Sequence, residues 1–244
     1  MLASAQSRRT LVIIPALNEA RSITRVVEAV RGADGALDIL VIDDGSHDET
    51  ATLARQAGAQ VASHPFNLGY GAALQTGYKW ALAHDYSYVV QLDADGQHDP
   101  AFLPRLLEPL HQGTADLVIG SRFLTDSGYR MDAARNAGRL FLQRLLRAFG
   151  GPRIADPTSG LQALRRPVIE FCCRDFYPSD FPDIDVLLVL HRRGFRLVEV
   201  PVTMAPSPAG RKTMHAGLKA LYYPYKILLA TVRAWRLTAS ALRS

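Results

Sequence analysis

The chain has 244 residues, of which 48% are hydrophobic and 21% are charged, and this length can enclose one large core or two modest ones. Its two cysteines, Cys172 and Cys173, are adjacent, which excludes a disulfide framework and leads us to expect reduced thiols in a cytoplasmic protein. No apolar run is long enough to cross a membrane, and the run after Arg9 is cut short at Pro15, so we expect neither a spanning helix nor a secretion signal.

Positive charge is concentrated toward the carboxyl terminus. The net charge is +5, and no acidic residue follows Glu199. The basic residues beyond it are Arg211, Lys212, Lys219, Lys226, Arg233, Arg236 and Arg243. This distribution indicates an anionic partner, such as a phospholipid surface, a phosphate-bearing substrate or a nucleic acid. We expect no nucleic acid, because the sequence has no helix-turn-helix, zinc or ribonucleoprotein signature.

Two short apolar runs, residues 10–15 and 37–43, are rich in β-branched side chains and are typical of buried parallel strands. Between them, apolar residues recur at helical spacing after a capping residue, Asn18 or Ser22. The apolar residues of this helix are Ile23, Val26, Val27 and Val30. This part of the chain therefore predicts a strand, helix, strand unit.

The same alternation continues along the chain. We expect helices at residues 50–56, 72–83 and 102–110, and strands at residues 60–63, 86–92 and 116–120. Alternation of this kind predicts an α/β fold, with a mainly parallel sheet covered by helices on both faces and ligands at the carboxyl ends of the strands. Asp43, Asp44, Asp93 and Asp95 all lie at such ends.

The second half of the chain is less regular. It predicts a long helix at 131–149, a strand at 161–165, helices near Pro167 and at 183–193, and a closing strand at 195–202. A last helix at 218–242, interrupted at Pro224, has its cations on roughly one side. Two interpretations of this tail stay open: a helix lying on a membrane surface, or a helix packed on the core with a solvated basic face.

The stretch VVQLDADGQHDP, residues 89–100, ends an apolar strand on two aspartates one residue apart. If the strand geometry continues, Asp93 and Asp95 project to the same side, where two like charges favour a divalent cation. An EF-hand loop is excluded, because it needs glycine sixth and glutamate twelfth, whereas Gly96 is fourth and Pro104 is twelfth. A polar turn after a buried strand stays open as the alternative.

Six motifs in order, VIIPALNEA, LVIDDGSHDET, NLGYGAALQTG, QLDADGQHDP, GSR and DPTSGLQAL, resemble the family 2 glycosyltransferases. The resemblance is greatest to the polyprenyl-phosphate sugar transferases typified by dolichyl-phosphate mannosyltransferase, and it covers residues 11–202. It implies a GT-A type fold and inverting transfer of a sugar from a nucleotide diphosphate sugar, of the GDP-mannose or UDP-glucose type, to a polyprenyl phosphate. We expect a catalytic domain at 8–203, with a nucleotide-binding half at 8–100 and an acceptor half at 101–203, and then a basic loop and amphipathic helical tail at 204–244.

The first two motifs concern the nucleoside. The resemblance implies that Pro15, Leu17 and Glu19 border it. It also implies that Asp43 or Asp44 accepts a hydrogen bond from the base or the ribose. For these aspartates, turn formation or helix capping stays open as the alternative.

The third and fourth motifs concern the diphosphate and a metal ion. Asn67 and Gly69 precede a helix, where exposed backbone amides could meet the diphosphate. Asp93, Asp95 and Gln97 match the family's metal-holding pattern. The resemblance thus implies Mg²⁺ or Mn²⁺ between these side chains and the diphosphate.

Three arginines mark the acceptor side. Arg122 follows a strand, and Arg135 and Arg139 are four residues apart on one helix face. The resemblance implies that Arg122 and Arg135 bind the lipid phosphate, with Arg139 beside them, and that the catalytic set is Asp95, Arg122 and Arg135. A phosphate acceptor is already largely dianionic at neutral pH and needs no general base. Orientation and charge stabilisation would then carry the catalysis.

A hydroxyl acceptor is the alternative for the same enzyme class. It would need a base, and Asp183, Asp185 and Asp156 are the candidates, although Asp183 also suits a helix cap. A nucleotidyltransferase is disfavoured, because PALNEA is not a glycine-rich basic loop. A non-catalytic module that binds a nucleotide sugar or a membrane is the alternative from another class.

One stretch departs from the family pattern. Ser207 stands where an arginine usually follows EVPV, and Arg211 and Lys212 follow Gly210. We expect Arg211 or Lys212 to contact the diphosphate instead. We expect a peripheral enzyme at the cytoplasmic face of the membrane, bound through the basic tail or recruited by a separate membrane subunit.

Overall fold

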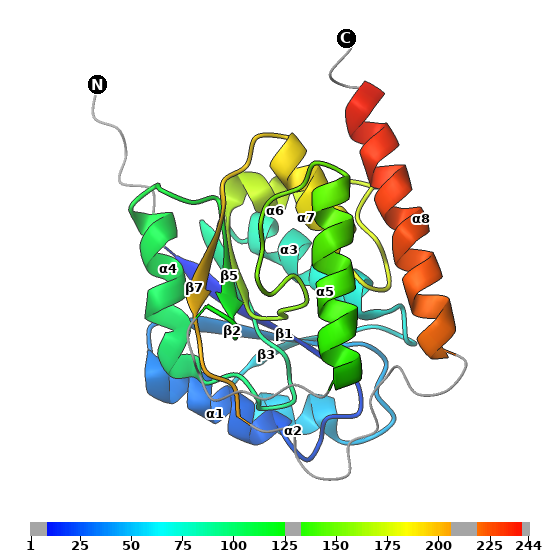
Figure 1. Cartoon of the computed structure of the whole chain (residues 1–244). Helices are drawn as coiled ribbons and strands as arrows, with labels where there is room; N and C mark the ends of the chain where they lie inside the picture. Colours follow the sequence, from blue (N-terminus) through cyan, green and yellow to red (C-terminus); the bar gives the residue numbers. More distant parts are fainter. Residues whose placement is uncertain (1–8, 125–132, 206–218, 241–244) are drawn as a thin grey trace.

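The computed structural model describes residues 9–124, 133–205 and 219–240 (Figure 1). At its centre is a seven-stranded sheet in the order β3-β2-β1-β4-β6-β5-β7. The strands are β1 Thr10–Ala16, β2 Asp38–Asp43, β3 Gln60–Ser63, β4 Tyr88–Gln91, β5 Leu117–Ser121, β6 Gln162–Arg165 and β7 Leu197–Pro201. Neighbouring strands are parallel except at β6, which is antiparallel to both β4 and β5. The predicted mainly parallel α/β sheet is confirmed.

Helices cover both faces of this sheet (Figure 1). On one face lie α3 Tyr70–Ala83, α5 Ala133–Ala148, α6 Arg166–Cys172, α7 Ile184–Arg192 and α8 Lys219–Ser240. On the other lie α1 Ile23–Ala33, α2 Thr50–Gln56 and α4 Leu103–His111, the last preceded by a short 3₁₀ helix, Pro100–Phe102. The chain therefore builds two cores, one on each side of the sheet.

The central strand β1 is apolar from Leu11 to Ala16 because it is covered on both faces. Leu11 and Ile13 belong to the core that includes α3, whereas Val12 and Ile14 belong to the core that includes α1. All four side chains are fully buried. Because successive side chains on a strand face opposite ways, a strand covered on both faces has no polar positions.

Two elements differ from the sequence-based expectation. The strand expected at 86–92 is shorter, since β4 runs from Tyr88 to Gln91, Asp93 lies after the strand and Asp95 lies in the turn that follows. The expected interruption of the last helix at Pro224 is wrong, because α8 continues through that position. Packing of α8 on α7 outweighs the loss of one backbone hydrogen bond at a proline.

The reversed strand β6 brings part of the second half to the ligand edge of the sheet. Its first residue, Gln162, is paired with Gln91 of β4 and Ile119 of β5. The loop that leads into β6, residues 156–160, therefore arrives where β4 and β5 end. In open α/β sheets this carboxyl edge is where ligands bind.

Among the described residues, no helix combines the length and the hydropathy needed to cross a bilayer. Cys172 is buried, Cys173 is half-buried, and both are free thiols, as the sequence predicted.

Candidate active site

The two aspartates of DADGQH lie directly after β4, at the carboxyl edge of the sheet. Asp95 Oδ1 accepts a hydrogen bond from the Gln97 backbone N–H at 2.9 Å, and the Gln97 side-chain amide donates to Asp95 Oδ2. Gln97 is thus bonded to Asp95. The turn alternative is therefore also correct for this segment, since Asp95 closes a turn that the carboxylate itself stabilises.

Asp93 is held by two side chains that the sequence analysis did not identify. Tyr70 donates from its hydroxyl to Asp93 Oδ1 at 2.9 Å, and His98 Nε2 lies 3.2 Å from Asp93 Oδ2. Burial alone would raise the pKa of Asp93, but hydrogen bonds from His98 and Tyr70 and the charge of Arg122 hold it below its ordinary value. Burial, together with the nearby Asp93, raises the pKa of Tyr70 well above its ordinary value, so the phenol keeps its proton.

The residues after β4 supply some, but not all, of the ligands that a hard divalent cation needs. Asp93 and Asp95 supply carboxylate oxygens, which Mg²⁺ and Mn²⁺ prefer. Within residues 9–124, 133–205 and 219–240, no three histidine, cysteine or acidic side chains come together as a metal site. Two carboxylates are still what a magnesium ion uses when substrate phosphates and water complete its coordination. The residues therefore fit a cation that binds together with a diphosphate.

Arg122, the predicted phosphate ligand, is paired with a buried carboxylate. Its Nε and Nη2 atoms donate to the two oxygens of Asp156 at 2.6 and 2.7 Å. Asp156 has no exposed surface, and Glu199 accepts hydrogen bonds from the backbone amides of Ala155 and Asp156. Asp156 therefore holds Arg122 in place, which is a different role from the general base considered for it.

The loop 156–160 connects this arginine to the aspartates of β4. At one end Asp156 holds Arg122, and at the other Gly160 lies against Asp93. A Cβ atom on Gly160 would lie 2.2 Å from Asp93 Oδ2. The motif DPTSG therefore joins the two halves of the predicted site, a connection that the sequence alone did not reveal.

Arg139 lies on the same side of the site. Its guanidinium is 4.2 Å from the ring centroid of Phe123, and Arg122 approaches the same ring at 5.5 Å. Arg139 also donates to the backbone oxygen of Ala155 at 2.9 Å. Arg135 lies one turn earlier on α5, but its side chain is outside the described residues. Phe123 and the loop before β6 thus bring two arginines of the acceptor half together.

Asp44, on the donor side, is bonded to other parts of the chain. It is 4% exposed, and its carboxylate accepts hydrogen bonds from the backbone amides of Leu68 and Gly69, both at 2.9 Å. His64 Nδ1 lies 2.7 Å from the same carboxylate. The protein itself thus supplies three donors to Asp44, and it is Asp43 whose carboxylate closes the local turn. The contact of Asp43 or Asp44 with the nucleoside stays a prediction.

The amides at the start of α3 are also occupied. Gly71 N–H donates to Asp180 O at 2.9 Å, and Ala72 N–H donates to Ser179 O at 2.8 Å. Gly69 has a φ of 106°, and a Cβ on it would lie 2.5 Å from Ser179 O. These glycines allow the loop before α7 to pack here, which corrects the expectation that free amides meet a diphosphate.

Other predicted donor residues lie at the same edge of the sheet. Pro15 is buried in β1, beyond the last pair between β1 and β4, and Leu17 is 38% exposed just after the strand. Glu19 accepts a hydrogen bond from Ser22 Oγ at 2.7 Å. Asp43 is buried at the end of β2, where its Oδ1 accepts from the Ser46 backbone N–H at 3.1 Å. Asn67 is exposed in the loop before α3.

The remaining candidate bases differ in position. Asp183 precedes α7 without a side-chain cap bond, and its charge contributes to the raised pKa of Tyr70. It therefore lies close to the predicted site. Asp185 accepts a hydrogen bond from the Asp183 backbone N–H at 3.1 Å, and burial raises the pKa of Asp185.

The described part of the tail supports elements of both interpretations. Ile227, Thr231 and Ala234 are buried, and α8 packs on α7. Leu229 and Trp235 remain 51% and 40% exposed. Ser207, Arg211 and Lys212, which concern the expected diphosphate loop, lie outside the described residues.

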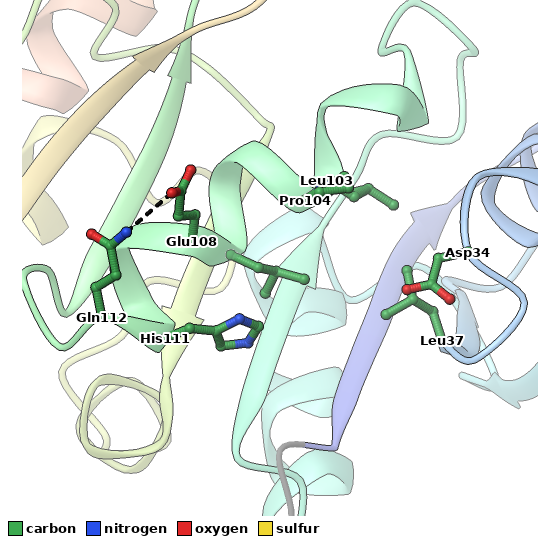
Figure 2. A pocket seen from close by; sticks show the side chains of 8 residues that line it. Asp34, Leu37, Leu103, Pro104, Glu108, His111 and Gln112 are labelled. Atoms are coloured by element: carbon green, nitrogen blue, oxygen red, sulfur yellow. Dashed lines mark hydrogen bonds between the residues drawn. The ribbon is translucent and has the colours of Figure 1, made fainter.

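A separate pocket of about 260 Å³ lies between α4 and the loop that precedes β2 (Figure 2). Its lining residues are Asp34, Leu37, Leu103, Pro104, Leu107, Glu108, His111 and Gln112. Because Leu37 directly precedes β2, this pocket lies at the end of the sheet opposite to Asp43. None of the residues predicted for the active site lines it.

Comparisons with known proteins identify the family of this chain. A family model described as Glycosyl transferase family 2 matches residues 11–172. A polyprenol monophosphomannose synthase of Mycolicibacterium smegmatis is 36% identical, over 85% of this chain and 82% of its own length. An undecaprenyl-phosphate mannosyltransferase of Micrococcus luteus is 34% identical, over 86% of this chain and 89% of its own length.

Solved structures show the same fold. Glucosyl-3-phosphoglycerate synthase from Mycobacterium tuberculosis, in complex with Mn²⁺ and UDP-glucose, superposes with a TM-score of 0.65 and 25% identity, over 94% of this chain and 79% of that chain. The same protein in complex with Mg²⁺ and UDP gives a TM-score of 0.66 and 25% identity, over 92% and 80% of the two chains. The expected GT-A type architecture is therefore confirmed.

Proposed function

This chain belongs to glycosyl transferase family 2, and from that premise we propose that it transfers a sugar from a nucleotide diphosphate sugar to a polyprenyl phosphate, with inversion and with a divalent cation. That it is a glycosyltransferase follows from the family itself. The acceptor class is proposed because the two sequence relatives reported above are named for polyprenol and undecaprenyl-phosphate substrates.

The observation that carries the proposal is the loop 156–160. It places Arg122 and Asp93 on either side of one short segment, with Asp156 bonded to the first and Gly160 in contact with the second. The loop thereby fixes the relative position of Asp93 and Arg122. Asp93 would bind the cation of the leaving diphosphate, and Arg122 would bind the incoming phosphate. In-line transfer between two anionic groups depends mainly on such positioning.

The donor half supplies the negative charge of the site. We propose that Asp93 and Asp95 hold Mg²⁺ or Mn²⁺ together with the diphosphate, and that Gln97 keeps Asp95 in position through its two hydrogen bonds. When bound, the cation supplies positive charge that stabilises the leaving nucleotide diphosphate. The oxygen donors of both aspartates match this choice of metal.

The acceptor half supplies the positive charge. Nε and Nη2 of Arg122 donate to Asp156, and Nη1 donates to the sulfur of Met204 at 3.6 Å. Because a thioether is a weak acceptor, we propose that the acceptor phosphate takes the place of this sulfur at Nη1. Arg139, held over Phe123, and Arg135 on the same helix supply the rest of the charge. A bound phosphate monoester needs no base to attack, which agrees with the engagement of Asp156 by Arg122.

We also propose that the exposed apolar residues of α8, Leu228, Leu229 and Trp235, bring the enzyme to the lipid surface. The basic residues of the tail would add attraction to anionic headgroups. Co-sedimentation with anionic and with neutral vesicles tests this. Binding to neither kind of vesicle would indicate recruitment by a separate membrane subunit.

The function itself is tested by a transfer assay with purified protein, Mn²⁺ or Mg²⁺, a panel of labelled nucleotide sugars including GDP-mannose and UDP-glucose, and polyprenyl phosphate. We expect label in the organic phase, reduced at least about 100-fold in Asp95→Ala and in Arg135→Ala. Arg147→Ala is the matched control, because Arg147 is an exposed arginine in the last turn of the same helix. It should leave turnover unchanged.

An absence of lipid product, with metal-dependent binding of the donor intact, would contradict the acceptor class. A hydroxyl acceptor would then be favoured, and Asp183 would be the first base to test because it lies near Tyr70. Donor binding without turnover on any acceptor would instead favour a non-catalytic module.

A further inference from the structure

The carboxylate of Asp93 is confined by three residues from three different parts of the chain. Tyr70 comes from the first turn of α3, His98 from the segment after β4, and Gly160 from the loop before β6. Asp93 itself is 29% exposed at its side chain. It is therefore surrounded on several sides and open on one.

The two hydrogen-bonding neighbours use different oxygens of the carboxylate. Tyr70 donates to Oδ1 at 2.9 Å, and His98 Nε2 lies 3.2 Å from Oδ2. The His98 side chain is 1% exposed, and its Nδ1 atom has no hydrogen-bond partner among the described residues. A proton on Nε2 therefore gives the better arrangement, because a buried orphan N–H costs more than an orphan acceptor. Each oxygen keeps lone-pair capacity for another ligand.

Gly160 lies against a third side of the Asp93 carboxylate. A Cβ atom on it would lie 2.2 Å from Asp93 Oδ2 and 2.8 Å from Cγ. No side chain other than hydrogen fits there while the Asp93 carboxylate keeps this orientation. The absence of a side chain at Gly160 is thus a condition for the position of Asp93.

We propose that Tyr70, His98 and Gly160 are positioning residues that fix the Asp93 carboxylate in the orientation in which it binds the divalent cation. This inference rests on the metal dependence included in the proposed function. None of the three residues would contact the cation or the substrate. They act by restricting Asp93, as hydrogen-bonded neighbours do for the ligands of metal sites in general.

The choice of partners supports a positioning role over a purely structural one. The bonded neighbours are a phenol and an imidazole rather than an arginine fork, so neither covers both oxygens of the carboxylate. Loss of such a neighbour at a metal site costs about 10- to 100-fold in metal affinity. An ordinary buried hydrogen bond would change stability without changing metal affinity.

The test measures binding of Mn²⁺ by the loss of the free-ion EPR signal, with UDP and with GDP in separate series and each nucleotide without protein as baseline. The variants are Tyr70→Phe, His98→Leu, His98→Gln and Gly160→Ala. Tyr78→Phe is the matched control, because Tyr78 is a buried tyrosine of the same helix whose hydroxyl donates to Gln91 Oε1, away from Asp93. Thermal unfolding of each variant shows whether it is folded at the temperature of the titration.

We expect the dissociation constant of Mn²⁺ to rise about 10-fold or more in Tyr70→Phe, His98→Leu and Gly160→Ala. It should stay near the wild-type value in Tyr78→Phe. His98→Gln should recover much of the affinity, since the glutamine amide can donate from nearly the place of Nε2.

Wild-type affinity in both Tyr70→Phe and His98→Leu would overturn the inference and leave the proposed function intact. An equal loss in Tyr78→Phe would also overturn it, because the effect would then be a general loss of order in α3. No binding of Mn²⁺ by the wild-type protein with either nucleotide would refute the metal dependence itself, and the inference with it.

Discussion

Two aspartates, Asp116 and Asp93, lie at opposite ends of the same sheet and are bonded in opposite ways. Asp116 directly precedes β5, and its side chain is 5% exposed. Arg196 donates to it from the backbone at 2.8 Å and from Nε at 3.2 Å, and the Arg165 guanidinium contacts the other oxygen. Asp93 follows β4, is 29% exposed at its side chain, and is bonded to Tyr70 and His98.

The difference lies in how much of the negative charge the protein itself compensates. Two arginines compensate Asp116, which ties the starts of β5 and β7 to the end of β6. The hydrogen bonds of Tyr70 and His98 fix the orientation of the Asp93 carboxylate. Its oxygens keep unused lone pairs, and one side of the group is exposed. The two arginines indicate a structural role for Asp116, whereas the single donors at Asp93 are consistent with its proposed role as a ligand of a cation.

The largest expected effect is on turnover at Asp93. Asp93→Asn keeps the size of the side chain but removes the charge that we propose binds the cation, so we expect sugar transfer to fall by at least about 100-fold. The midpoint of thermal unfolding should change little. Steady-state assays and differential scanning fluorimetry on the same preparation measure both quantities. Turnover of Asp93→Asn within a few-fold of wild type would contradict a functional role for Asp93 and a purely structural one for Asp116.

Asp116→Asn should have the opposite pattern of effects: lower stability and unchanged turnover. Asp116→Asn loses charge-assisted hydrogen bonds to Arg196 and Arg165, and we expect the free energy of unfolding to fall by about 2 kcal/mol. The value is modest because both arginines remain partly exposed to water. Turnover below the unfolding transition should match the wild type. Urea unfolding measures the stability, and a stable but inactive variant would contradict the assignment.

The smallest expected effect is on the response of stability to acid. Burial alone would raise the pKa of Asp116, but the hydrogen bonds from Arg196 and the charge of Arg165 hold it below its ordinary value. The stabilisation is then complete above the unfolded-state pKa of about 3.9 and is lost as the pH falls through the lower folded-state pKa. Asp116→Asn should therefore unfold with a weaker dependence on pH below about 4. Asp85→Asn, at an 87% exposed side chain, is the control and should follow the wild type.

The fold could be predicted from the sequence because the residues within each strand and helix mark that element. Apolar runs such as residues 10–15 and 37–43 can only be strands covered on both faces, and the helices between them have clear periodicity. The direction of β6 was not specified by any local pattern. An antiparallel strand of four residues, Gln162–Arg165, resembles a parallel one until its partners are known.

The site was predicted to the extent that motifs mark it. Asp93, Asp95 and Arg122 are site residues predicted from the sequence, and in the structure Arg122 and Asp93 contact opposite ends of the loop 156–160. The supporting residues were missed, because Tyr70 lies 23 positions from Asp93 along the chain. The partners of Asp44 in the loop before α3 were missed for the same reason, since they are 24 and 25 positions away.

The place of β6 also has a consequence for the order of folding. β4 and β5 do not pair with each other, and in the described sheet they are joined only through β6. The nascent chain can form β1 to β4 early, but Gly160 reaches Asp93 only when β6 inserts between β4 and β5. Such long-range pairing is slow relative to local structure. We therefore expect Asp93 to reach its proposed orientation only at the step that closes the sheet, so that a partly folded chain would bind the cation more weakly than the native protein.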